Sequence, residues 1–342
     1  MNPSKSYSLT FLILCLVLMV CFGLNLSLGS VAIPFPKVFS SLFGSSTGDS
    51  FEYIILNYRL PKAITAIIVG SGLGVSGLLM QTLFKNPLAG PYVLGITSGA
   101  SLGVAILILG SSVFGGFLTT FLLSKWSLVI AASLGSFLVL LTVLLVANKV
   151  KDTMTLLIIG LMFGSLTSAI VSVLSYFSHA EQLQQYIFWG FGSLGDLDWT
   201  SIKILCLVYS IGLLCCILVI KTLNALLLGD QYAKSLGVNL KTSRLVIIIA
   251  TSLIAGSITA FAGPIAFIGL AVPHLTRQLF KTSNHGVLIP AVLVFGAILM
   301  LVCDSVAQLP TSDYTLPINA ITSFIGAPVV IWLLVRKRKM IF

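Results

Sequence analysis

The sequence contains few charged residues. Only 8% of its 342 residues are Asp, Glu, Lys or Arg, whereas 57% are hydrophobic. A water-soluble protein needs far more charge to cover its surface, so a soluble globular fold is excluded. Apolar stretches long enough to cross a hydrocarbon core of about 30 Å recur along the whole chain. Because backbone polar groups in lipid must be satisfied within a segment, the sequence predicts an all-α integral membrane protein.

The sequence also lacks the motifs of a nucleotide-hydrolysing enzyme or a metalloenzyme. Neither a Walker A loop, G-x-x-x-x-G-K-[ST], nor an H-E-x-x-H pair is present. The histidines are scattered, and no two cysteines have metal-ligand spacing; they are His179, His274 and His285, and Cys15, Cys21, Cys206, Cys215, Cys216 and Cys303. We therefore expect no catalytic residues, no metal site, no cofactor and no disulfide.

Apolar runs between polar breaks predict ten transmembrane helices in a single permease domain over residues 1–342. Because the longest polar segments, Gly29–Lys62 and Thr222–Arg244, are too short for an independent core, no soluble domain is expected. The spans are roughly Leu9–Leu28, Ile64–Phe84, Val93–Gly110, Ser127–Ala147, Thr153–Tyr176, Ser201–Ile220, Leu245–Ala262, Pro264–Leu279, Val287–Ala307 and Ile318–Val335.

The basic residues predict the orientation of these spans. With both termini in the cytoplasm, fourteen lysines and arginines lie inside and five outside, as the positive-inside rule requires. The inner residues are Lys5, Lys85, Lys149, Lys151, Lys221, Lys234, Lys241, Arg244, Arg277, Lys281, Arg336, Lys337, Arg338 and Lys339; the outer ones are Lys37, Arg59, Lys62, Lys125 and Lys203. The net charge of +10 is thus an orientation signal, and no nucleic-acid partner is expected.

Glycine and proline are frequent for a helical bundle, with 30 and 12 residues. The glycines between Gly70 and Gly77 lie inside an apolar run, which favours close helix packing through small residues rather than a phosphate-binding loop. Breaks such as Asn86-Pro87 and Gly263-Pro264 fall at predicted helix ends. Together these breaks favour a bundle that forms a transport pathway.

An ordered set of segments resembles the FecCD-type permeases of ATP-binding-cassette importers, which move iron-siderophore complexes, haem and cobalamin. The matching segments are Arg59–Lys62, Met80–Ala89, Leu94–Ala100, Gly229–Val238, Gly263–His274 and Gly326–Leu334. The resemblance implies a homodimer of ten-helix protomers of the type II importer kind in the inner membrane. It also implies two separate ATPase subunits beneath the dimer and a substrate-binding protein on its outer face.

The cytoplasmic loop over about residues 222–244 matches the family's ATPase-coupling element. The sequence predicts a short helix over Asn224–Leu228, a turn at Gly229-Asp230 and a second short helix ending at a left-handed Gly237. Residues implied to contact the ATPase are Leu228, Gly229, Asp230, Gln231, Ala233, Lys234, Leu236, Gly237 and Val238. Gln231 departs from the acid found in many relatives. An ordinary solvated connector is the plainer alternative.

Arg59 and Lys62 lie on the outer side, against the positive-inside bias. In relatives the basic pair of this motif meets acidic residues of the binding protein, so both residues are expected to dock it. Interfacial snorkelling of the two side chains is the alternative. A further outer arginine of some relatives is replaced here by Gln308.

Three more positions have two interpretations. Asp304, near the outer end of the ninth span, could couple proton movement, but a structural polar partner is the favoured interpretation. His274 and Arg277, one turn apart, are expected to contact headgroups or loops rather than to bind a metal. Gly164, Ser165, Ser168 and Ser172 form a stripe on the fifth span that either lines the pathway or packs helices.

The function predicted from these features is the permease subunit of an importer for a metal chelate, most often iron-siderophore, with haem or cobalamin as alternative cargo. The competing class is a secondary transporter driven by an ion gradient. Such a protein should carry paired acids near the membrane midplane and internal repeats. Asp304 is off-centre and no repeat is evident, which favours the importer.

Overall fold

The computed structural model describes residues 7–44, 49–110, 125–149, 153–309 and 314–335. Within these ranges every regular element is a helix, which confirms the predicted all-α fold class. The inner lysines and arginines at positions 5, 151 and 336–339 lie outside the described residues.

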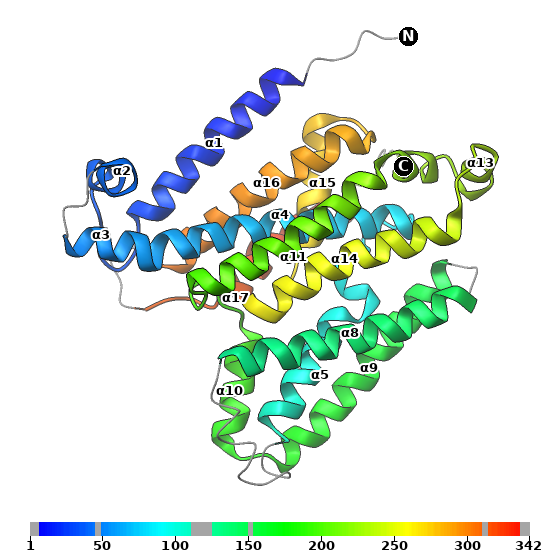
Figure 1. Ribbon diagram of the computed structural model, residues 1–342, viewed down its shortest axis with the longest axis horizontal. Coiled ribbons are helices and arrows are strands. Elements are labelled where there is room, and N and C mark those ends of the chain that lie inside the picture. The colour runs from blue at the N-terminus through cyan, green and yellow to red at the C-terminus, as the bar shows by residue number, and fades with distance from the viewer. Residues whose placement is uncertain (1–6, 45–48, 111–124, 150–152, 310–313, 336–342) are drawn as a thin grey trace.

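Helix α4 (Leu60–Leu83) is the centre of the bundle. Nearly all of its side chains are buried, and α14 (Leu240–Ala262), α15 (Ile268–Phe280) and α16 (His285–Ala307) pack around it (Figure 1). Its glycines make this packing close. A Cβ atom added at Gly77 would lie 1.7 Å from the carbonyl oxygen of Gly269, and one at Gly70 would lie 2.1 Å from that of Gly296. The helix-packing interpretation of this glycine-rich stretch is thereby confirmed.

The remaining helices form two groups around this centre. On one side α1 (Ser8–Ser27) packs on α16 and α11 (Trp199–Leu218) packs on α14. On the other side α5 (Ile96–Ile108), α8 (Lys125–Lys149), α9 (Thr153–Phe177) and α10 (Ala180–Gly190) form the lower part of Figure 1. Contacts of α14 with α8 and α5 join the two groups. Helix α17 (Ile318–Val335) packs against α15 and α16.

Each of the ten predicted spans overlaps one of these helices. Seven helical segments among the described residues are long and apolar enough to cross a membrane: Ser8–Ser27, Ser50–Leu83, Trp126–Val143, Ile158–Phe177, Trp199–Leu218, Leu240–Ala262 and His285–Ala307. The helices at Ile96–Ile108, Ile268–Phe280 and Ile318–Val335 are shorter.

The second predicted span begins earlier than expected. The sequence places its start at Ile64, after Pro61, but the helix runs without interruption from α3 (Ser50–Ile54) through a π-helical turn, η1 (Ile55–Arg59), into α4. A proline removes one helical hydrogen bond and crowds the preceding turn, and the wider π turn accommodates both effects. Arg59 and Lys62 are therefore helical residues and do not lie in a loop before the helix.

Short helices cap the two ends of the bundle. Helices α2 (Phe35–Phe43) and α3 lie at one end, and α12 (Ile220–Leu226) and α13 (Asp230–Ser235) lie at the opposite end (Figure 1). A 3-10 turn, η2 (Pro91–Leu94), leads from α4 into α5. The bundle therefore has two distinct ends, and a different polar cluster lies at each.

Candidate functional site

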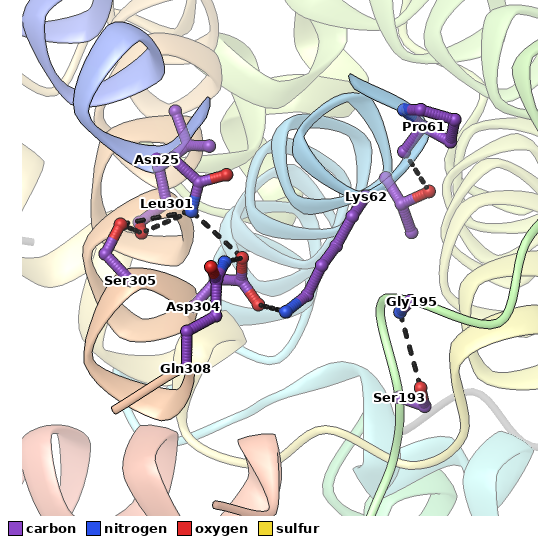
Figure 2. Close-up of polar contacts among 10 residues, drawn as sticks. Asn25, Pro61, Lys62, Ser193, Gly195, Leu301, Asp304, Ser305 and Gln308 are labelled. Atoms are coloured by element: carbon purple, nitrogen blue, oxygen red, sulfur yellow. Dashed lines mark hydrogen bonds and ion pairs between the residues drawn. The ribbon is translucent and has the colours of Figure 1, made fainter. Parts of the chain in front are cut away.

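A buried polar cluster lies at the end of the bundle that carries α2 and α3. Asp304 on α16 has only 2% of its side chain exposed, and three side chains donate to it (Figure 2). Its Oδ2 accepts from Asn25 Nδ2 at 2.9 Å and from Gln308 Nε2 at 2.7 Å. Its Oδ1 lies 3.1 Å from Lys62 Nζ. Asp304 thus joins α1, α4 and α16, in agreement with its expected role as a structural polar partner.

The two cations predicted to dock a partner are both engaged within the chain. Arg59 Nη1 donates to the carbonyls of Leu26 at 2.7 Å and Ser27 at 2.8 Å, and Nη2 donates to the carbonyl of Val31. The first two carbonyls belong to the last turn of α1, which has no further turn to satisfy them. Arg59 therefore caps α1, while Lys62 pairs with Asp304. The snorkelling alternative describes neither residue.

A cavity of about 810 Å³ opens beside this cluster. Its wall includes Arg59, Lys62, Asp304 and Gln308, together with the loop that joins α10 to α11 and the loop that precedes α17. The sequence singled out these four residues separately, and the structure places them on one wall. Asn25 also belongs to the polar cluster around Asp304, and it was not identified from the sequence. Its signal was an amide inside an otherwise apolar span, which in a membrane implies a polar partner.

A second polar cluster lies at the opposite end. The His285 ring contacts Thr82 Oγ1 of α4 at 2.8 Å and Asn224 Oδ1 of α12 at 2.9 Å. Arg277 donates to Gln81 Oε1 at 3.2 Å. The expectation that Arg277 reaches a headgroup or a loop is therefore wrong, because its partner is a side chain of α4. These contacts tie α12, α15 and α16 to the C-terminal end of α4.

The predicted coupling loop forms two short helices. The first, α12, begins and ends earlier than the predicted Asn224–Leu228. Gly229 (φ +102°) provides the turn into α13, and Gly237 (φ +83°) ends it. The N–H of Gly237 donates to the carbonyl of Lys234 at 2.9 Å, and that of Val238 donates to Ala233 at 3.0 Å. The left-handed conformation predicted for Gly237 is confirmed.

The surface of this loop is largely apolar. Leu228, Tyr232 and Leu236 have 63%, 54% and 58% of their areas exposed. Ala233 is buried, and Val238 is half-buried and packs against the chain's own core. Gln231 and Lys234 lie exposed on α13. Exposed large apolar side chains outside the lipid indicate a protein partner.

Asp230, the first residue of α13, anchors the loop to the bundle. Its Oδ1 lies 2.7 Å from Lys85 Nζ, just after α4, and its Oδ2 lies 2.8 Å from Arg244 Nη2 on α14. Partial burial raises the pKa of Asp230, but the ion pairs with Lys85 and Arg244 outweigh that effect and hold the pKa below its ordinary value. The carboxylate therefore stays ionised between the two cations.

The predicted stripe on α9 is not part of either polar cluster. Ser165, Ser168 and Ser172 are exposed, and Gly164 is half-buried near Ser98. Ser165 Oγ donates to the carbonyl of Leu161 at 3.3 Å, and Ser172 Oγ donates to that of Ser168 at 2.9 Å. Because these hydroxyls are satisfied by their own helix, the stripe is a surface of small residues that requires no polar partner.

The structure offers no alternative reactive centre within the residues it describes. No group of three or more His, Cys, Asp or Glu residues there could hold a metal ion. The spacing G-x-S-x-G does occur at Gly99–Gly103, but inside α5 and without the strand-to-helix turn that exposes a nucleophile. Both glycines instead face the backbone of α8, where added Cβ atoms would lie 2.5 and 2.0 Å from carbonyl oxygens.

Comparison with known proteins agrees with this picture. The model of the FecCD transport family matches residues 16–336. The hemin transport system permease protein HmuU of Yersinia pestis is 35% identical over 336 residues, which cover 97% of this chain and 96% of that protein. The vitamin B12 import system permease protein BtuC of Klebsiella pneumoniae is 36% identical over 327 residues, which cover 95% and 93%.

A solved structure has the same fold. It is described as a metal-chelate type ABC transporter in an inward-facing conformation, and it is 30% identical with a TM-score of 0.80, covering 97% of this chain and all of the other. The fold and these matches define a multi-pass, all-helical membrane transport protein. The chain belongs to the FecCD transport family, as its resemblance to the FecCD-type permeases of ABC importers predicted.

Proposed function

We propose that this chain is the membrane-spanning subunit of an ATP-driven importer that carries a metal chelate, with iron-siderophore as the first candidate and haem or cobalamin as alternatives. The observation that carries the proposal is the family match over residues 16–336, on a fold with seven candidate membrane spans. Relatives named for hemin and vitamin B12 import, and a structural neighbour of the metal-chelate type, support this class of cargo.

The proposed topology is ten spans in one permease domain over residues 1–342, with both termini in the cytoplasm of the cell and the chain in the inner membrane. Ten helices coincide with the ten predicted spans. The fourteen inner and five outer basic residues support this orientation. Lys85 and Arg244 meet Asp230 at the α13 end, while Lys37 pairs with Asp49 at the other.

The proposed partner at the cytoplasmic end is an ATPase subunit, two per assembly. The loop over residues 222–244 supports this role, because it presents Leu228, Tyr232 and Leu236 on a compact pair of short helices held by ion pairs. The chain itself has no Walker A motif, so ATP hydrolysis belongs to the partner. This subunit is therefore proposed to be a transporter component and not an enzyme.

The proposed partner at the outer end is a substrate-binding protein, with docking at Arg59 and Lys62. Both residues line the cavity of about 810 Å³. Arg59 is committed to three backbone carbonyls, so Lys62 is the cation that a carboxylate of the partner can recruit. Charged groups at such a rim set association rate and docking register.

A second copy of the chain is proposed to face α9 and complete the pathway. Helix α9 has the smallest buried share of the seven candidate spans, 11%. Its stripe of Gly164, Ser165, Ser168 and Ser172 consists of small residues, and the hydroxyls of Ser165 and Ser172 donate to carbonyls of their own helix. Such a wall lets a bulky chelate pass without binding it tightly.

The cargo is tested by reconstituting the permease with its ATPase and binding protein in proteoliposomes. The vesicles are offered ferric siderophores, haem and cobalamin separately, and ATP-dependent accumulation of each is measured. We expect accumulation of one metal chelate, and competition by the same compound that the isolated binding protein binds. Accumulation of none of these chelates, in a complex that hydrolyses ATP, would contradict the proposed substrate class.

A further inference from the structure

We propose that Asp304 holds Lys62 in an internal ion pair which a carboxylate of the docking substrate-binding protein competes for, so that Lys62 exchanges its partner on docking (Figure 2). The inference rests on the docking role proposed above for Lys62. It adds an intramolecular competitor, and it assigns to Asp304 the control of how readily the cation becomes available.

Asp304 is the fixed half of the pair. Its side chain is 2% exposed, and its Oδ2 already accepts from two amides, Asn25 on α1 and Gln308 on its own helix. Asn25 is held in turn by Ser305 Oγ, at 3.0 Å. Only Oδ1 depends on Lys62. When the lysine leaves, the carboxylate retains two hydrogen bonds, which makes its separation from the cation possible in a site where an unpaired charge would otherwise be prohibitive.

Lys62 is the movable half. Its side chain is 24% exposed and lines the wall of the outer cavity. Its methylene stem passes beside Gly195 in the loop between α10 and α11, where an added Cβ would lie 3.8 Å from Lys62 Cδ. Even a Cβ at that point would make only an ordinary van der Waals contact, so the loop does not clamp the stem. A lysine ammonium is a compact charge on a flexible chain, so it can turn from Asp304 into the cavity without moving α4.

The other charged groups of this cavity do not offer the same exchange. Arg59 donates to three backbone carbonyls, and releasing it would uncap α1. Asp196, also on the cavity wall, has the same sign as the incoming carboxylate and opposes its entry. Lys62 is therefore the cation of this cavity that can exchange the Asp304 carboxylate for a carboxylate of the binding protein.

The proposed exchange predicts whether a substitution of Asp304 speeds or slows docking. Asp304 lowers the attraction of the cavity for a partner carboxylate in two ways, since it competes for the ammonium and adds its own negative charge. Replacing it with Asn should therefore speed docking, although the substitution removes a buried charge that links α16 to α4. A purely structural ion pair predicts the opposite, because loosening α16 against α4 would disorder the docking face.

The test measures association of the binding protein with the nanodisc-embedded permease–ATPase complex across a salt series. We expect Asp304→Asn to raise the association rate about 3- to 10-fold at low salt and to steepen its salt dependence. We expect Lys62→Gln to slow association. In the double variant the gain from Asp304→Asn should disappear, because the released cation is no longer there.

The outcomes separate this inference from the docking proposal. If Lys62→Gln leaves association unchanged, the docking role of Lys62 is wrong. If Lys62→Gln slows association but a folded Asp304→Asn leaves it unchanged or slower, docking stands and the exchange is overturned. Should Asp304→Asn fail to fold, Asn25→Leu replaces it. Asn25→Leu removes one of the two amide donors of Asp304, so the carboxylate depends more strongly on Lys62 and the ion pair tightens. Association of the binding protein should then become slower. An unchanged or faster association rate would contradict the exchange.

Discussion

Glycines at single positions determine how closely the helices around α4 approach it. Gly70 on α4 and Gly296 on α16 face each other, and an added Cβ on either would lie 2.1 or 2.4 Å from the carbonyl oxygen of the other. A Cβ added at Gly77 would lie 1.7 Å from the carbonyl oxygen of Gly269 on α15. Close backbone approach is a common way to bind membrane helices tightly, because lipid supplies no hydrophobic driving force between them.

We predict that Gly77→Ala destabilises the permease by roughly 1–3 kcal/mol or more, because the new methyl group meets a backbone carbonyl that cannot move without shifting α15. The measurement is the thermal midpoint of the detergent-solubilised protein. Gly190→Ala is the matched control. Its Cβ would meet nothing within 4 Å, so its effect should stay within about 0.5 kcal/mol. Equal midpoints for the two variants would show that α4 and α15 pack less closely than described.

At this scale the sequence predicts residue types better than residue partners. The glycine-rich run indicated close packing, and Lys62 and Asp304 were each singled out as charges in unfavourable surroundings. Their pairing could not be predicted, because it depends on which face of α4 meets α16. That choice follows from the summed packing of many apolar side chains, none of which has a distinctive pattern.

Among the elements, the loop that carries α12 and α13 shows how a short segment is made rigid. Glycines with positive φ angles open and close α13, and Asp230 ties it to the ends of α4 and α14. An isolated six-residue helix is not stable in water, so these tertiary contacts must hold it. Any force on α13 then reaches α4, the central helix of the bundle.

We predict that Asp230→Asn weakens the protection of the α13 backbone amides against hydrogen exchange at pH 7. The native pKa of Asp230 lies below its ordinary value, so the ion pairs stabilise α13 fully above about pH 4, the unfolded value, and this contribution is lost as the pH falls through the native pKa. The parental protein and the variant should therefore differ at pH 7 and converge in acid.

Asp49→Asn is the control for this experiment. It breaks a comparable ion pair with Lys37, at 2.8 Å, on the other end of the bundle, and should leave α13 unchanged. Identical exchange of α13 in the parental and Asp230→Asn proteins at pH 7 would show that Lys85 and Arg244 do not hold the loop.

The sequence predicted the end of a helix correctly where a capping glycine was present. It misplaced the start of a helix where the backbone adjusted to a proline. Gly237 ended α13 as predicted. The second span was predicted to begin at Ile64, yet the π turn at Ile55–Arg59 precedes Pro61 in a helix that runs on from Ser50. A carbonyl in this turn, that of Leu56, accepts from Trp199 Nε1 at 3.2 Å. Such a compensation needs a partner from another helix, which local sequence does not reveal.

Across the whole molecule the two polar ends have different roles. The end that carries α2 and α3 holds a buried acid, two cations and a cavity, and the end that carries α12 and α13 presents an apolar pair of short helices fixed by salt bridges. A transporter driven by an ion gradient would concentrate its ionisable groups near the midplane. Here Asp304 lies in the last turn of α16, where it is paired with Lys62, and Glu52 lies near the start of its candidate span.

The central claim is that transport through this chain is driven by ATP hydrolysed on a separate subunit. The measurement that tests it most directly is chelate uptake into proteoliposomes that contain either the permease alone or the permease with its ATPase and binding protein. We predict that the permease alone neither hydrolyses ATP nor accumulates chelate, with or without a proton or sodium gradient. The full assembly should accumulate chelate only with ATP, and collapsing the ion gradients should not stop it. Gradient-driven uptake by the permease alone would contradict the account.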